Sequence, residues 1–320
     1  MYSLALALRE KNYDVSFLSQ RDETANTMLK SSGFDVQVFE PQGFDAVAKV
    51  ALKAFSPDIF IQDVLETSDA AMNLVRSWTQ IPVVHFDDCG AGLRLADVVI
   101  NGFAFLWGKY LASECKAQLF EGPKYMIYNS ELSRFVRTER QLPGLRWTVF
   151  LSYGGTDTHF ITERALAALN VIQTPLALTV NLGPGSERRP SLDAIASASR
   201  HRVEVLKAAP NIFQLMSEAD LVLCAGGNTL FELAALGVPS ISIAAEPHEM
   251  HNLNYWSKAG STLALGRERD LDFHILAAKV EDLIAHPERL SAMSQFGKAN
   301  ADCLGLDRVV EIIESKAPRN

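Results

Sequence analysis

Short runs of apolar and β-branched residues alternate along the whole chain with longer segments in which apolar residues recur at helical spacing. In the N-terminal half the short runs predict strands at residues 14–18, 35–39, 58–62, 82–86 and 97–101. Helical periodicity fills the intervals, for example over residues 44–55 and 68–78. Strands that alternate with helices in this way predict βα units built around a parallel sheet.

The C-terminal half repeats the alternation and predicts strands at residues 147–152, 176–182, 202–206, 220–224 and 239–244. From Leu271 onward the pattern is helical, and the last helix is expected at residues 307–315. This helix is expected to return to the first domain. The sequence QLPG at residues 141–144 separates the two alternations. We therefore expect an α/β protein of two doubly wound Rossmann-like domains, residues 1–142 and 143–320, facing a cleft where such folds bind ligands.

Composition narrows the class of protein. The chain has 320 residues with 38 acidic and 30 basic side chains, a formal net charge of −8. This charge argues against nucleic acid as a partner. The four cysteines form no C-x-x-C pair, which favours reduced thiols and a cytoplasmic location over a disulfide framework. The most apolar stretch, residues 221–245, is interrupted by glycines and Glu232, so stable membrane insertion is not expected.

Three glycine-rich turns each follow a predicted strand, at Gly154-Gly155, at Gly183 with Gly185, and at Gly226-Gly227. Glycine lets a backbone approach a phosphate closely, and the first turn of a helix offers free amide donors and the positive end of the helix dipole. None of the turns matches the dinucleotide-binding fingerprint or the P-loop. Each turn taken singly is also explained by tight chain reversal, so their combination in one domain is what indicates a phosphate site.

Residues after the third turn extend this hypothesis. Asn228 or Thr229 can cap the following helix, and Glu232 lies about one turn further, where a carboxylate can reach ribose hydroxyls. No His, Cys or carboxylate spacing is typical of zinc, so neither a metal nor a cofactor is expected.

Four segments carry a resemblance to a known family. They are PNIFQLMSEADLVLCAGGNTLFELAALGVPSISIA with the following HEMHNLNYWSKAG, FLSYGGTDTHFIT, FDDCGAGLRLADVVIN and GPKYMIYNSEL. Together they resemble GT-B nucleotide-sugar enzymes: the peptidoglycan N-acetylglucosaminyltransferase and, more closely, the UDP-sugar hydrolase of pseudaminic acid synthesis with its spore-coat polysaccharide relatives. The resemblance covers most of the chain and is most specific in the C-terminal half.

The resemblance implies a role for each matching residue. The backbone near Ile212 would contact the base, and Glu232 would hold the ribose. The residues that would bind the nucleotide and its diphosphate are Gly154, Gly155, Asp157, Gly226, Gly227, Asn228 and Thr229. The sugar side would comprise Asp87, Asp88, Glu249 and Asn252, with His248 as a candidate catalytic group. For Asp87 and Asp88, a capping or turn role at a strand end is an open alternative to sugar binding. For His248, a solvent-facing position without a catalytic role is an open alternative. His85 is expected to lie in the core.

This sequence also departs from the family. The family begins with a strand and a G-x-G-H loop that supplies a general base, whereas this chain begins within the following helix. We therefore expect a gap between the strands at 14–18 and 58–62, and a shortened chain. Leu65 stands where the hydrolase has a tyrosine, and Gly92 and Asn129 each stand where it has an arginine. These changes remove polar groups on the sugar side only.

Three functions follow from the resemblance. The first is hydrolysis of the anomeric C–O bond of a UDP-sugar, with release of UDP, in surface-polysaccharide or nonulosonic sugar synthesis. The second is glycosyl transfer from a UDP-sugar donor to a sugar or lipid acceptor. The third is binding of a nucleotide sugar without catalysis. In each case the partner is a small UDP-linked sugar; the sugar, the acceptor and the oligomeric state stay open. The aromatic run at residues 102–110 is interpreted as an ordinary hydrophobic loop or helix beside the cleft, with an acceptor or membrane-surface patch as the alternative.

Overall fold

The computed structural model describes residues 1–40, 42–103, 117–137 and 146–317. The chain forms two compact units, one of Met1–Asn129 with Leu304–Asn320 and one of Ser130–Cys303. The sequence boundary expected at residues 141–144 and most of the aromatic run lie outside the described residues. We call the two parts the N-terminal unit and the C-terminal unit, and each is described by itself.

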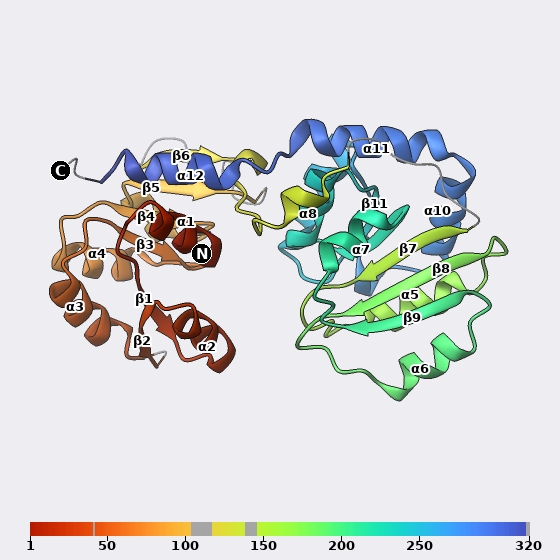
Figure 1. The fold of residues 1–320 in the computed structure, drawn as a ribbon, viewed down its shortest axis with the longest axis horizontal. Coiled ribbons are helices and arrows are strands. Elements are labelled where there is room, and N and C mark those ends of the chain that lie inside the picture. Colours follow the sequence, from red (N-terminus) through yellow and green to blue (C-terminus); the bar gives the residue numbers. More distant parts are fainter. Residues whose placement is uncertain (41, 104–116, 138–145, 318–320) are drawn as a thin grey trace. The chain divides into compact units, whose positions relative to one another are not determined.

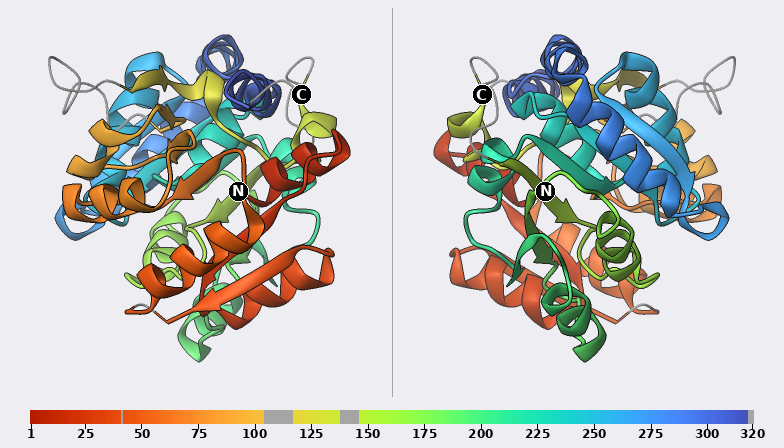
Figure 2. Two further views of the ribbon diagram at one scale, coloured as in Figure 1. Left: turned by 90° about the vertical axis from the view of Figure 1, so that its left-hand side faces the viewer. Right: turned by 90° about the vertical axis from the view of Figure 1, so that its right-hand side faces the viewer.

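The C-terminal unit contains a six-stranded parallel sheet in the order β12-β11-β10-β7-β8-β9. Its strands run from green to blue in Figures 1 and 2. They are β7 (Trp147–Ser152), β8 (Leu176–Leu182), β9 (Arg202–Lys207), β10 (Leu221–Ala225), β11 (Ser240–Ala244) and β12 (Thr262–Arg267). The helices are α5 (Ile161–Leu169), α6 (Pro190–Ser197), α7 (Ile212–Glu218), α8 (Asn228–Leu236), α9 (Glu249–Ala259), α10 (His274–Ala285) and α11 (Pro287–Asn300).

The centre of this sheet is buried on both faces, as its continuous apolar sequence predicts. Every residue of β10 and of β11 is buried. One face packs against apolar side chains of α5 and α10, including Leu166 and Val280, in a single large cluster. The helix between the two strands, α8, ends at Gly237, whose φ of +71° suits a residue without a Cβ atom. The sheet therefore gives the turns at its carboxyl edge a rigid base.

The N-terminal unit divides its strands between two parallel sheets. A two-stranded sheet pairs β1 (Ser16–Gln20) with β2 (Asp35–Phe39). A four-stranded sheet has the order β3 (Phe60–Asp63), β4 (Val83–Phe86), β5 (Val98–Asn101) and β6 (Gln118–Glu121). The helices of this unit are α1 (Tyr2–Glu10), α2 (Glu23–Ser31), α3 (Phe44–Phe55), α4 (Asp69–Trp78) and α12 (Gly305–Glu314).

No strand of the described residues pairs with β1 on the side away from β2, or with β3 on the side away from β4. A gap between these two strands is what the sequence predicts. The structure does not test the further expectation of a missing glycine loop with a histidine.

The last helix, α12, packs against α1 through apolar residues that include Leu4, Leu8 and Val309. Gly305 begins α12 so close to Met126 that an added Cβ atom would lie 2.1 Å from the carbonyl oxygen of Met126. The last helix, predicted at residues 307–315, is thus observed as α12, which starts two residues earlier. It belongs to the N-terminal unit.

Candidate nucleotide-sugar site

The turn after β7 packs tightly on the turn after β8. A Cβ atom on Gly183 would lie 2.3 Å from the carbonyl oxygen of Gly154, and the amide of Gly185 donates to the carbonyl of Gly155 at 2.9 Å. In contrast, Cβ atoms on Gly154 or Gly155 would meet nothing within 4 Å. Gly154 also has a φ of +86°, a conformation that glycine adopts without strain. The first predicted glycine turn is therefore held in place from one side and open on the other.

Asp157 completes this turn as a helix cap. Its carboxylate accepts the amide hydrogens of Ile161 at 2.9 Å and of Thr162 at 3.0 Å, at the start of α5. The side chain is buried, so these bonds consume the first free amides of α5. The predicted contact of Asp157 with a diphosphate stays a prediction, and the geometry instead gives Asp157 the role of fixing the turn.

The turn between β10 and α8 leaves its amide donors available. No side chain caps α8, whose N-cap is Gly227, and the described residues include no acceptor for the amides of Asn228 and Thr229. A Cβ atom on Gly226 would lie 2.3 Å from Cδ1 of Leu253, so only glycine fits there. Free amides at the positive end of a helix form an anion site. Neither Asn228 nor Thr229 acts as the predicted cap.

Glu232 lies one turn further along α8 and is half-buried. No hydrogen-bond or ion-pair partner of its carboxylate is found among the described residues. Burial raises the pKa of Glu232 from 4.5 to about 7. The structure therefore keeps an unsatisfied carboxylate beside the open start of α8, where hydroxyl donors of a ligand would satisfy it.

Two of the predicted sugar-side residues hold the neighbouring turns together. Oε2 of Glu249 accepts the amide hydrogens of Ala245 at 2.7 Å and Glu246 at 3.2 Å. Nδ2 of Asn252 donates to the carbonyl of Gly226 at 3.0 Å, and this side chain is buried. Both residues therefore lie at the candidate site, and a direct contact with a sugar stays a prediction for each.

His248 and Ile212 occupy the same edge of the sheet. His248 is an exposed residue immediately before α9, in the turn that follows β11. Ile212 begins α7, in the turn that follows β9, where Ala208 has a φ of +46°. The predicted roles of His248 in catalysis and of Ile212 in base recognition stay predictions.

His159 links three turns of this edge and was not singled out by the sequence. Its Nε2 lies 3.3 Å from Oε1 of Glu246, after β11, and its Nδ1 lies 3.4 Å from Oε1 of Glu268, after β12. His159 itself follows the Gly154-Gly155 turn. Because the three residues are far apart in sequence and follow no spacing rule, no sequence signal could have identified this contact.

The two predicted aspartates of the N-terminal unit have different environments. Asp88 is buried and accepts hydrogen bonds from the amides of Thr67 at 2.9 Å and Gly90 at 2.7 Å. Its Oδ2 lies 2.7 Å from Nδ1 of His85 and also accepts the hydroxyl of Thr67. Burial opposes the charge of Asp88, but the bonds from His85 and Thr67 prevail and lower its pKa. The geometry therefore makes Asp88 an anchor for the loops around His85, which lies in the core as predicted.

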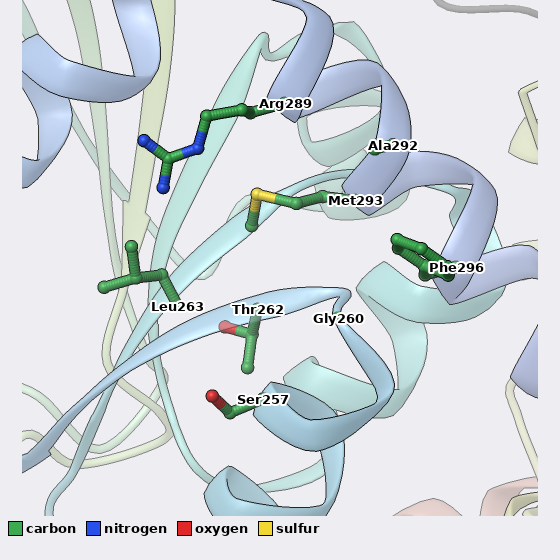
Figure 3. Close-up of a pocket in the computed structure, with 8 residues that line it drawn as sticks. All are labelled: Ser257, Gly260, Thr262, Leu263, Arg289, Ala292, Met293 and Phe296. Carbon is green, nitrogen blue, oxygen red and sulfur yellow. The ribbon is translucent and has the colours of Figure 1, made fainter. Parts of the chain in front are cut away.

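A groove of about 290 Å³ lies elsewhere on the C-terminal unit (Figure 3). It is lined by the end of α9, the beginning of β12 and one face of α11, with Arg289 and Phe296 among its residues. Because Thr262 and Leu263 begin β12, the groove is at the amino edge of the sheet, whereas the glycine turns are at the carboxyl edge.

Among the described residues, no group of three or more His, Cys, Asp or Glu could hold a metal ion, and no helix is long and apolar enough to cross a membrane.

Residues 148–306 match the family described as the glycosyltransferase family 28 C-terminal domain. The spore coat polysaccharide biosynthesis protein SpsG of Bacillus subtilis is 22% identical over 271 residues, which are 82% of this chain and 78% of SpsG. A UDP-N-acetylglucosamine–N-acetylmuramyl-(pentapeptide) pyrophosphoryl-undecaprenol N-acetylglucosamine transferase of Anaeromyxobacter sp. is 25% identical over 317 residues, which are 90% of this chain and 81% of that enzyme. This chain spans only 50% and 48% of the length of two other relatives that it matches.

The crystal structure of MurG from Acinetobacter baumannii has the same fold. It matches with a TM-score of 0.76 and 17% identity, over 98% of this chain and 94% of MurG. The α/β fold with parallel sheets is thus the GT-B fold predicted from the sequence. Residues 148–306, which match the glycosyltransferase family 28 C-terminal domain, contain every glycine turn of the candidate site.

Proposed function

We propose that this protein is a glycosyltransferase that uses a UDP-sugar as donor. The observation that carries the proposal is the pairing of Glu232 with the uncapped start of α8. A half-buried carboxylate without a partner needs hydroxyl donors, and free helix amides need an anion. A nucleoside diphosphate sugar provides both, through its ribose hydroxyls and its diphosphate.

The same groups support catalysis. When the bond between the anomeric carbon and the diphosphate breaks, negative charge develops on the leaving UDP. The amides of Asn228 and Thr229, the dipole of α8 and the open turn at Gly154-Gly155 would stabilise that charge. Because the turns are fixed by Asp157, Gly183 and Asn252, these donors need little reorganisation during the reaction.

Transfer is favoured over hydrolysis by the names of the relatives. The Anaeromyxobacter relative is named as an N-acetylglucosamine transferase, and the family is described as a glycosyltransferase domain. Transfer, the second of the three functions expected from the sequence, is therefore better supported than hydrolysis. The pseudaminic acid assignment receives no support from these relatives. Synthesis of a surface polysaccharide is the process that the name of SpsG supports.

Two experiments test the proposal. In calorimetric titrations with UDP, CDP and GDP, we expect UDP to bind most tightly, and absence of binding by all three would refute a nucleotide site. In an assay of UDP release from UDP-N-acetylglucosamine, we expect release to depend on an added acceptor alcohol. Equal release in water alone would support hydrolysis, and tight binding of UDP-N-acetylglucosamine without release would support a binding protein.

A further inference from the structure

His159 lies between two carboxylates at the carboxyl edge of the six-stranded sheet in the C-terminal unit. Its Nε2 is 3.3 Å from Oε1 of Glu246, in the turn after β11, and its Nδ1 is 3.4 Å from Oε1 of Glu268, immediately after β12. His159 itself follows the Gly154-Gly155 turn, two residues before α5 begins at Ile161. One imidazole thus joins three turns of the same edge, with a carboxylate at each ring nitrogen.

This arrangement fits the doubly protonated form of the ring. A neutral imidazole has a hydrogen on one nitrogen only, so its other nitrogen would present a lone pair to a carboxylate oxygen. The imidazolium donates from both nitrogens and places a positive charge between two negative ones. Histidine is also the side chain whose charge ordinarily changes between about pH 5 and 8. Both contacts of His159 are therefore favourable at once only on the acidic side of that range.

The other charged groups of these turns do not replace His159. Arg164, on α5, donates to the backbone carbonyl of Glu268 at 3.0 Å and not to its carboxylate. Arg267 directly precedes Glu268 but forms no ion pair with any described residue, and its buried Nε has no acceptor. The carboxylate of Glu268 also accepts the backbone amide of Arg269. Within the part of the chain that the structure describes, His159 is the cationic side chain in ion-pair contact with both carboxylates.

The two carboxylates differ in exposure, and this difference decides which contact is lost with the proton. The side chain of Glu268 is 6% exposed, whereas that of Glu246 is 50% exposed. A buried carboxylate without its donor is costly, but water can hydrate an exposed one. The remaining hydrogen of a neutral His159 therefore stays on Glu268. Loss of the second proton detaches Glu246 and leaves the contact after β12 in place.

Glu246 belongs to the turn in which α9 begins. Oε2 of Glu249 accepts the amide hydrogens of Ala245 and Glu246, which closes this turn, and Asn252 on the same helix donates to the carbonyl of Gly226. These bonds tie the turn after β11 to the turn after β10. The contact between Glu246 and His159 ties it in addition to the segment that follows the Gly154-Gly155 turn.

We infer that doubly protonated His159 positions the turn after β11 against the Gly154-Gly155 turn, and that the donor sugar binds more tightly in this state. The inference rests on the proposed transferase function, in which the glycine turns receive the diphosphate and the turn before α9 contacts the sugar. His159 acts through Glu246 and is therefore a positioning residue. UDP alone has no sugar, so its affinity does not depend on this link.

The test measures dissociation constants for UDP and UDP-N-acetylglucosamine by calorimetry at pH 6 and pH 8, with wild type, His159→Gln and Glu246→Gln. Each variant is compared with the wild type at the same pH, so that the titrations of Glu232 and of the ligand cancel. At pH 6 we expect each substitution to weaken binding of UDP-N-acetylglucosamine by about three- to tenfold. At pH 8, and for UDP at both pH values, the variants should match the wild type. His274→Gln, which changes an exposed histidine of α10, is the matched control and should have no effect.

A double substitution shows whether the two residues act as a pair. His159→Gln combined with Glu246→Gln should bind UDP-N-acetylglucosamine at pH 6 no more weakly than either single variant does. Additive losses, an equal loss at pH 6 and pH 8, or no loss at pH 6 would overturn the inference, because a purely structural role does not depend on the proton.

Melting temperatures of the same proteins measure the coupling without a ligand. The effects of the two substitutions should be non-additive at pH 6 and additive at pH 8, and additivity at both pH values would also overturn the inference. Failure of the wild-type protein to bind UDP would instead refute the proposed function, and the melting temperatures would still decide whether the proton-dependent link exists.

Discussion

Replacing Glu232 with glutamine is expected to change stability and UDP affinity in opposite directions. The carboxylate of Glu232 is half-buried on α8 with no partner among the described residues, and burial raises its pKa from 4.5 to about 7. The folded protein thus binds this proton more tightly than the unfolded chain does. Stability is highest where Glu232 is protonated in both states, and it falls as the pH rises from about 4.5 through 7.

With a pKa of 4.5 in the unfolded chain and about 7 in the folded protein, the charge of Glu232 lowers the free energy of unfolding by about 3 kcal/mol at pH 8 and by less than about 1 kcal/mol at pH 5. Glutamine carries no charge to desolvate, so Glu232→Gln should unfold at a higher temperature than the wild type at pH 8, with nearly equal midpoints at pH 5. For a unit of this size, each kcal/mol corresponds to about 2–4 °C in the melting temperature. UDP affinity should fall by about 10- to 150-fold, because bonds from ribose hydroxyls to a charged acceptor are lost.

Thermal melts at the two pH values and calorimetric titration with UDP measure both effects. Glu204→Gln, which changes an exposed carboxylate on β9, is the matched control and should reproduce the wild type. A Glu232→Gln variant whose melting temperature differs from that of the wild type by the same amount at pH 5 and pH 8 would refute the desolvation argument. An unchanged dissociation constant for UDP would refute the ribose contact.

Three further substitutions test the turns and their supports. Gly226→Ala should weaken UDP binding at least tenfold, measured by calorimetry, because the added carbon would lie 2.3 Å from Leu253 and displace the start of α8; unchanged binding would show that the turn adapts. Asp157→Ala should lower the free energy of unfolding by about 0.5–2 kcal/mol in urea titrations, through loss of the cap of α5, and a neutral result would contradict that cap. Asp88→Ala should cost more, about 2–4 kcal/mol, because several buried donors including His85 lose their acceptor, and a stability within 0.5 kcal/mol of the wild type would exclude the anchoring role.

Periodicity predicted most of the strands because buried parallel strands are continuous apolar runs. The strands at 35–39, 147–152 and 176–182 were predicted with their observed bounds. The strand predicted at 14–18 begins at Ser16, since its first two residues precede the pairing with β2. Strands β6 and β12 were not predicted. Both are at the edge of a sheet and are only partly buried, so their sequences lack a continuous apolar run.

The candidate site was predictable where it depends on local sequence. Glycines between a strand and a helix, followed by Glu232, identified the turn at α8. The hydrogen-bond partners of Asp157, Glu249 and Asn252 were not predictable, because a side-chain carboxylate or amide near a turn can bond equally well to a ligand or to the backbone. Only the distances distinguish these uses. Asp87 and Asp88 show the same limit, since burial raises the pKa of Asp87 whereas bonds from His85 and Thr67 lower the pKa of the adjacent Asp88.

The divided sheet of the N-terminal unit has a consequence for hydrogen exchange. Amide hydrogens of β10 are protected by strands on both sides, and solvent can reach them only when much of the C-terminal unit opens. The strands β1 and β3 each have one edge whose amides donate to no strand of the described residues. Deuterium should therefore enter these edges through small local openings, long before it reaches the interior of the six-stranded sheet.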